Sequence, residues 1–207
     1  QKEAKLRILG ALLSDGLPTP DDSMLIGLAV AGGLLEAFLS KSEVARLAER
    51  IAEIGGLDLV VNNAGLSLSK TLLETTEADW DLQHDVMAKG SFLVSRETAR
   101  AMIEQGMGGD IVYVSSKNSV FAGPNNIAYS AAKADQAHQV RLLAAELGAH
   151  GIRVNGINPD GVVRGSGIFA GGWGAERAKV YGVPEEKLGE YYASRTILKH
   201  EVLPEHV

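Results

Sequence analysis

The stretch LDLVVNNAG, residues 57–65, decides the fold class of this chain. Four of its first five residues are apolar, with Asp58 as the exception and two β-branched valines at the end, and small and polar residues follow at once. A run of this kind is typical of a strand that is buried in a parallel sheet. Residues 42–54, directly upstream, have the pattern of an amphipathic helix that Gly55-Gly56 stops. The sequence therefore predicts a helix followed by a buried strand.

The alternation of helix and strand continues toward the C-terminus. A capping-box pattern at Thr76–Asp79 precedes a helical stretch that runs to about Gln105, and the apolar residues 111–114 predict a second strand. An Ala- and Leu-rich helix over Tyr129–Leu147 and a third strand over 152–157 follow. This order predicts an α/β, Rossmann-like fold, with a doubly wound parallel sheet and helices on both faces.

Composition excludes several classes of protein. The chain has 207 residues, with 26 acidic and 20 basic side chains and a net charge of −6, so a nucleic acid is a poor candidate partner. The absence of cysteine excludes disulfides and thiolate catalysis, and the five histidines lack metal-ligand spacing, so no metal is expected. The longest apolar run, residues 24–35, is shorter than the roughly 20 residues that a membrane span needs. A soluble, cytoplasmic protein without a membrane partner is predicted.

Polar residues gather where the predicted strands end. Asn62 follows the first strand, Ser116 follows the second, and residues 158–161 follow the third. In a parallel sheet these ends share one edge, outside which ligands bind. Tyr129 and Lys133 are four residues apart, so they lie on one face of their helix, and an ammonium beside a phenol favours the phenolate. A tyrosine with a lowered pKa can act as a general acid or base.

Four motifs together resemble the short-chain dehydrogenase/reductase family. They are NNAG at 62–65, a serine thirteen positions before the tyrosine, Tyr-x-x-x-Lys at 129–133, and Asn158-Pro159. A narrower resemblance covers 158–168, 172–184 and 196–206, which look like the dehydrogenase domain of bifunctional rhamnulose-1-phosphate aldolase/short-chain dehydrogenase proteins of rhamnose catabolism. The likeness spans 42–207, the expected Rossmann domain, and leaves 1–41 as an atypical N-terminal segment of uncertain structure.

The resemblance implies an oxidoreductase that uses NAD, or NADP, to interconvert a small hydroxy-carbonyl compound such as lactaldehyde with its alcohol or acid. Ser116 would polarise the carbonyl, Tyr129 would transfer the proton, and Lys133 would hold the cofactor ribose. The implied cofactor-binding residues are Asn62, Ala64, Gly65, Tyr129, Lys133, Pro159, Gly161 and Val162, and the implied substrate-binding residues are Ser116, Asn118, Arg164 and Trp173. Plainer roles stay open: strand-end capping for Asn62, a surface loop for Asn118, solvation for Arg164 and packing for Trp173.

Three departures from the family pattern support a second hypothesis. The glycine-rich loop that receives the cofactor pyrophosphate is not found, and Gly32-Gly33 is its nearest candidate. Met87 stands where the family has an asparagine that supports a proton-relay water, which a thioether cannot hold. The domain also looks truncated at both ends relative to the family. The alternative is therefore a catalytically impaired or inactive Rossmann-fold remnant that keeps the fold and its oligomer contacts.

The resemblance also implies assembly. In the family, the helices that correspond to 79–105 and 129–147 pair with their copies in a neighbouring subunit. The second of these helices is apolar on more than one face, with small or apolar residues at Ala132, Leu142, Ala145 and Leu147. A homodimer or homotetramer is predicted under both hypotheses.

Overall fold

The computed structural model describes residues 8–9, 49, 51–53, 55–165 and 168–207. Most of the segment 1–41, including the Gly32-Gly33 pair, and most of the predicted helix 42–54 lie outside the described residues. Within that predicted helix, residues 51–53 are helical, and the side chain of Ile51 is buried in the main core.

The described strands form one parallel sheet in the order β1-β2-β3-β4. The strands are β1 (Ile8–Leu9), β2 (Leu59–Asn62), β3 (Gly109–Val114) and β4 (Ile152–Ile157). The predicted first strand begins two residues later than expected, because both backbone groups of Leu57 bond to the Gln105 side chain rather than to a strand. The parallel pairing confirms the α/β, Rossmann-like class.

The predicted helix 79–105 consists of three segments that run into one another. They are α3 (Glu77–His84), a π-helical turn (Asp85–Lys89) and α4 (Gly90–Gln105). The capping box is confirmed: the Thr76 side chain accepts from the backbone of Asp79, whose carboxylate accepts from the backbone of Thr76. The remaining helices are α5 (Ile127–Leu147), α6 (Gly174–Tyr181) and α7 (Leu188–Arg195), with 3₁₀ turns at Lys117–Ser119, Gly148–His150, Glu185–Lys187 and Pro204–His206 and a π turn at Phe169–Trp173.

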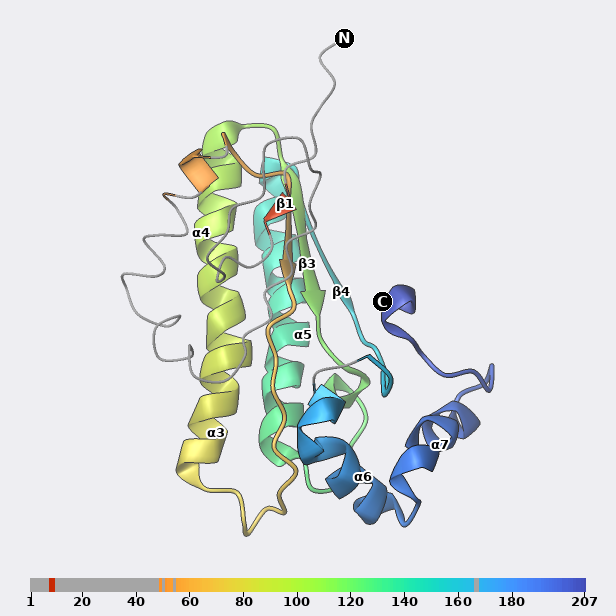
Figure 1. Cartoon of the computed structure of the whole chain (residues 1–207). Coiled ribbons are helices and arrows are strands. Elements are labelled where there is room, and N and C mark those ends of the chain that lie inside the picture. Colours follow the sequence, from red (N-terminus) through yellow and green to blue (C-terminus); the bar gives the residue numbers. More distant parts are fainter. Residues whose placement is uncertain (1–7, 10–48, 50, 54, 166–167) are drawn as a thin grey trace.

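The main core lies between the sheet and the pair α4 and α5, which run beside each other along the strands (Figure 1). Its buried members alternate along each strand, as a sheet with one covered face requires. Figure 1 also shows α6 and α7 beyond the end of the sheet to which the strands point, so these two helices stand next to the strand ends. The buried core residues are Ile51, Leu57, Val60, Ala99, Met102, Ile111, Tyr113, Leu147, Ile152 and Val154.

Candidate active site

Backbone hydrogen bonds join the segments that leave β3 and β4. Ser115 donates its N–H to the carbonyl of Ile157 (2.9 Å), and Lys117 donates its N–H to the carbonyl of Pro159 (3.0 Å). The Lys117 ammonium also lies 2.6 Å from a carboxylate oxygen of Asp160. The two strand ends that the sequence predicts to be neighbours are therefore joined by hydrogen bonds. We call the two joined segments, residues 115–118 and 157–160, the rim of the site.

Ser116 and Tyr129 meet on this rim. Ser116 caps the 3₁₀ turn that follows β3, because its Oγ accepts from the backbone N–H of Asn118 (3.2 Å). Tyr129 lies in the first turn of α5, and the Ser116 side chain is close enough to its hydroxyl to lower the pKa of the phenol by hydrogen bonding. Ser116 and Tyr129, thirteen residues apart in the sequence, therefore lie near each other, and two neighbouring hydroxyls can both donate to one carbonyl oxygen.

Lys133 lies one helical turn beyond Tyr129 and is 3% exposed. Its Nζ donates to the carbonyl of Val114 (2.8 Å) and lies 5.8 Å from the centre of the Tyr129 ring. The helix backbone at this point is fixed as well, because Ser115 Oγ donates to the Lys133 carbonyl (2.9 Å). Burial lowers the pKa of Lys133 to about 8, since the charged form loses hydration inside the protein.

The electrostatics of Tyr129 differ from the sequence-based expectation. Lys133 was expected to lower the pKa of this phenol, but burial raises it, and the Ser116 hydrogen bond opposes the rise. The reason is geometric: the Lys133 ammonium is held by the Val114 carbonyl beside the ring, and no contact to the Tyr129 hydroxyl is recorded in the described residues. In this structure, therefore, Tyr129 is set up as a proton donor rather than as a preformed phenolate.

The π turn before α4 is hydrogen-bonded to two side chains of α5. A π turn interrupts the regular hydrogen-bond pattern and frees backbone carbonyls. Here the side-chain amide of Gln136 donates to the Met87 carbonyl (3.0 Å), and that of Gln139 donates to the Ala88 carbonyl (2.8 Å). Sequence reasoning missed both glutamines, although Gln136 stands three residues after Lys133 and so shares its helix face. Met87 itself is fully buried.

Lys133 and Gly65 are the residues that could hold the ribose end of a nicotinamide cofactor. The two lie close together: a Cβ atom at Gly65 would be in van der Waals contact with Lys133 Nζ (3.6 Å) and Met87 Sδ (3.8 Å). Ala64 packs against the same cluster, which includes Met87, Ala132 and Tyr129. A buried ammonium with donors beyond the one that Val114 accepts is suited to a pair of hydroxyl groups. The observed residues thus fit the group that the resemblance implies.

Two implied cofactor residues have other duties in the structure. The Asn62 side chain is buried and donates to Ser95 Oγ (2.9 Å), which is hydrogen-bonded to the Tyr113 hydroxyl (2.7 Å). Its amide therefore points into the core, and only its backbone remains for a cofactor. Gly161 is required by packing, because a Cβ atom there would lie 2.6 Å from the Tyr192 ring. Pro159 and Val162 lie on the same segment, half-buried.

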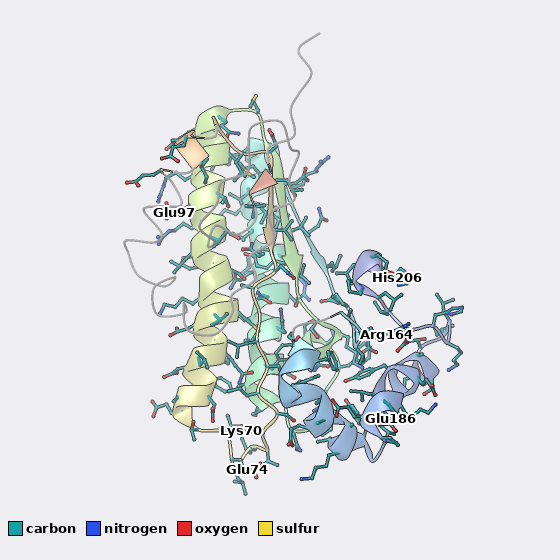
Figure 2. The ribbon with its side chains drawn as sticks, in the orientation of Figure 1. Lys70, Glu74, Glu97, Arg164, Glu186 and His206 are labelled. Carbon is teal, nitrogen blue, oxygen red and sulfur yellow. The ribbon has the colours of Figure 1, made fainter. Side chains whose placement is uncertain are left out.

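The implied substrate residues are dispersed around the rim. Asn118 is half-buried on the 3₁₀ turn after Ser116, close to Gly123. Arg164 is exposed and ion-paired with Glu201 (2.5 Å), and Figure 2 shows it between the end of β4 and α7. Trp173 ends the π turn before α6, and its indole is edge-on to Phe169 (4.7 Å between ring centres). Asn118 and Trp173 lie on segments next to Ser116 and α6, whereas the Arg164 guanidinium is engaged elsewhere.

The described residues contain no cluster of His, Asp or Glu that could hold a metal ion. In the same part of the chain, every helix is too short or too polar to cross a membrane.

Comparison with known proteins leads to the same family that the motifs at the strand ends resemble. A model of the short chain dehydrogenase family matches residues 37–167. The uncharacterized oxidoreductase YuxG of Bacillus subtilis is 47% identical over 153 residues, which are 74% of this chain and 22% of that protein. Carbonyl reductase [NADPH] 2 of Sus scrofa is 41% identical over 114 residues, which are 55% of this chain and 47% of that protein. The chain thus spans about a fifth and about half of these relatives.

Among solved structures, sorbitol-6-phosphate 2-dehydrogenase SrlD from Erwinia amylovora superimposes with a TM-score of 0.76 at 28% identity. The superposition covers 86% of this chain and 67% of that one. It includes more of the chain than the family model does, so the likeness in fold extends beyond the matched motifs.

Proposed function

The chain belongs to the short-chain dehydrogenase/reductase family, and from this premise we propose that it transfers hydride between a nicotinamide cofactor and a small hydroxy-carbonyl compound. The observation that carries the proposal is the nearness of the Ser116 and Tyr129 side chains at the strand ends, with the buried Lys133 one helical turn beyond Tyr129. A neutral phenol next to a second hydroxyl offers two donors to a single carbonyl oxygen, and such donors stabilise the charge that develops on it.

Each residue has a defined part in this chemistry. Ser116 and Tyr129 hold the carbonyl oxygen, and Tyr129 donates its proton as charge develops there. Lys133 holds the ribose hydroxyls and keeps a positive charge beside the phenol as it loses its proton. The bound cofactor supplies the hydride. Ala64 and Gly65 line its ribose side, while Pro159, Gly161 and Val162 follow β4 at the nicotinamide end. Asn62 contributes at most its backbone.

We propose lactaldehyde or a similar hydroxy-carbonyl compound as the substrate class, with Asn118 and Trp173 around it and Arg164 at the outer rim. The motifs at 158–168, 172–184 and 196–206 support this assignment, because they resemble the dehydrogenase domain of rhamnulose-1-phosphate aldolase/dehydrogenase proteins. The length of YuxG is consistent with such a two-part protein, since the match covers 22% of it. We also propose that the protein acts in the cytoplasm.

The choice of cofactor is proposed as NAD on the basis of that catabolic subgroup. The porcine relative is named for NADPH, so both cofactors belong in the test. The assay follows NADH or NADPH oxidation at 340 nm with lactaldehyde and with diacetyl as carbonyl probes. We expect turnover with at least one pair that is lost in Tyr129→Phe. No turnover of either probe with either cofactor would contradict the proposal.

A catalytically impaired domain is the second candidate, and Met87 is the observation that favours it. Its side chain is fully buried against Ala132 and Tyr129, so the thioether fills space next to the catalytic helix and offers no strong hydrogen-bond donor.

We expect Met87→Asn to raise turnover, or to create it in a silent protein, because an amide at this position can order a relay water. The measurement is kcat with saturating cofactor, compared with Met87→Leu, which changes the shape of the side chain but adds no polar group. Equal rates for wild type and Met87→Asn would mean that another polar group, such as Asn118, already orders the water.

We propose that the chain forms a homodimer or homotetramer through α4 and α5. Large apolar side chains are exposed on both helices: Phe92 is 46% and Leu142 is 56% exposed. Of the four small or apolar residues noted on this helix, Ala132 and Leu147 are buried within the chain itself, so they belong to its internal face. Covering the exposed residues in a symmetric interface would remove apolar surface from water.

Light scattering coupled to size exclusion tests this assembly at tens of micromolar protein. We expect the mass of a dimer or tetramer, and a shift toward monomer for Leu142→Glu. A folded wild-type monomer would contradict the proposed interface.

A further inference from the structure

Arg177 on α6 is a buried cation that the proposed chemistry does not use. Its side chain is 1% exposed, and within the described residues Lys133 is the other buried cation. Burying a guanidinium is costly unless hydrogen bonds and charge compensate for lost hydration. The recorded hydrogen bonds of Arg177 go to neutral oxygens, the Pro124 carbonyl (2.7 Å) and the Tyr181 hydroxyl (2.5 Å). Because no carboxylate partner is recorded for Arg177 in the described residues, the cost of burying this cation has to be offset by another role of the side chain.

The bond to Pro124 ties α6 to the loop that begins the catalytic helix. Pro124 stands two residues before Asn126, the N-cap of α5, and five residues before Tyr129. On its other side this loop is held by Ser67, whose hydroxyl donates to Asn126 Oδ1 (3.3 Å). Asn125, between Pro124 and Asn126, has a positive φ of 52°, a left-handed conformation that asparagine adopts more readily than most other residues except glycine. The start of α5 is therefore a constrained turn that Arg177 secures from the α6 side.

Aromatic contacts also link Arg177 to α7 and to the segment that contains Ser116. The Arg177 guanidinium lies over the rings of Tyr181 (4.7 Å) and Trp173 (5.3 Å). Tyr181 packs on Tyr191 of α7 (4.7 Å between ring centres), and the neighbouring Tyr192 ring lies against Gly161 and under the Lys117 ammonium (5.5 Å). Lys117 directly follows Ser116. Arg177 is thus linked to both segments that carry the proposed reacting hydroxyls. It bonds directly to the loop before Tyr129, and it is linked to the segment of Ser116 through the tyrosines of α6 and α7.

We propose that Arg177 is a positioning residue for the proposed reaction, whose assignment this inference presupposes. Through Pro124 it fixes the start of α5, and with it the Tyr129 phenol relative to Ser116. Through Tyr181 it holds α6 and α7 closed beside the substrate position near Trp173. A misplacement of reacting groups by about 1 Å costs up to a hundredfold in rate, so such a tie has a large effect at a distance.

The experiment compares Arg177→Met with Arg177→Lys in the full chain. Methionine keeps the bulk but removes the charge and the hydrogen bonds to Pro124 and Tyr181, whereas lysine keeps the charge and can restore one of these bonds. Arg153→Met is the matched control, because Arg153 is an exposed side chain on β4. We expect Arg177→Met to raise the substrate KM roughly tenfold or more and to shift the pH profile of kcat/KM. Cofactor affinity should stay within about twofold. Arg177→Lys should recover part of the loss.

A second readout does not depend on activity. Trp80 and Trp173 are the two tryptophans of the chain, so Trp80→Phe leaves Trp173 as the single reporter next to Arg177. In this background Arg177→Met should raise acrylamide quenching of Trp173 about twofold or more, because the indole loses its cover. Arg153→Met should leave quenching unchanged. If the wild type is inactive but Arg177→Met still shows this quenching change, the proposed function is refuted. The attachment of α6 to the start of α5 is then still supported.

Two results would overturn the inference. One is an Arg177→Met protein with wild-type KM, pH profile and quenching. The other is a uniform loss of thermal stability with an unchanged KM and pH profile in the folded fraction, which is what a merely structural side chain would give. If Arg177→Met does not fold, Arg177→Lys and Tyr181→Phe decide: wild-type kinetics and quenching in both would reject the positioning role.

Discussion

Tyr129→Phe should abolish turnover while the affinity for the cofactor stays nearly unchanged. The phenol supplies the proton, and general acid catalysis is worth about 10²–10⁴ in rate, whereas the ring of phenylalanine still packs against Met87 and Ala132. Steady-state kinetics give the loss in kcat, and fluorescence titration with NADH or NADPH gives the affinity.

Tyr113→Phe is the matched control for this experiment. Tyr113 is another buried tyrosine whose hydroxyl is hydrogen-bonded, but its partners are Ser95 and Gln139 in the core. Its loss should lower the free energy of unfolding by about 1 kcal/mol and leave kcat unchanged. A Tyr129→Phe protein that keeps most of its activity would show that the acid/base residue is assigned wrongly.

Lys133→Ala should lose both turnover and cofactor affinity, since the proposed function gives this ammonium two duties. We expect kcat to fall by at least about a hundredfold and the cofactor Kd to rise by about tenfold or more. Titration of cofactor fluorescence separates this variant from Tyr129→Phe, which changes kcat alone. Lys89→Ala is the control, because Lys89 is exposed and pairs with Asp85 on the π turn near the site. A Lys133→Ala protein with wild-type affinity would contradict the ribose contact.

The lowered pKa of Lys133 adds a test that needs no cofactor. The folded pKa is about 8, below the ordinary value of 10.5, so between these pH values the unfolded chain binds more protons than the folded one. Stability therefore rises with pH across this window, by on the order of 3 kcal/mol in total. Below pH 8 the cost of burying the charge is fully present. Urea unfolding between pH 7 and 10.5 should show this rise in wild type and a smaller one in Lys133→Ala.

The strand ends and the tyrosine helix could be predicted from sequence because their signals are local. β-branched runs, glycine stops and the four-residue spacing of Tyr129 and Lys133 each depend on a few neighbouring residues. Parallel strands then bring their ends to one edge without further information. The pairing of Ser116 with Tyr129 is different, because it was implied by the resemblance to the family and not by any local signal.

The rest depends on contacts between distant segments. The direction of the Asn62 amide is decided by Ser95, 33 residues away, and the role of Arg177 by Pro124, 53 residues away. The π turn at Met87 has no local sequence signal, and its freed carbonyls meet Gln136 and Gln139 from another helix. The pKa of Tyr129 was predicted in the wrong direction because proximity in sequence indicates a charge but not the burial that outweighs it.

Titration of the full chain with NADH and NADPH, followed by the fluorescence of the bound nicotinamide, tests most directly whether the strand-end site is a cofactor site. The proposed function predicts saturable binding in the micromolar range for at least one cofactor, retained in Tyr129→Phe and weakened in Lys133→Ala. No saturable binding of either cofactor, or equal binding by wild type and Lys133→Ala, would contradict it.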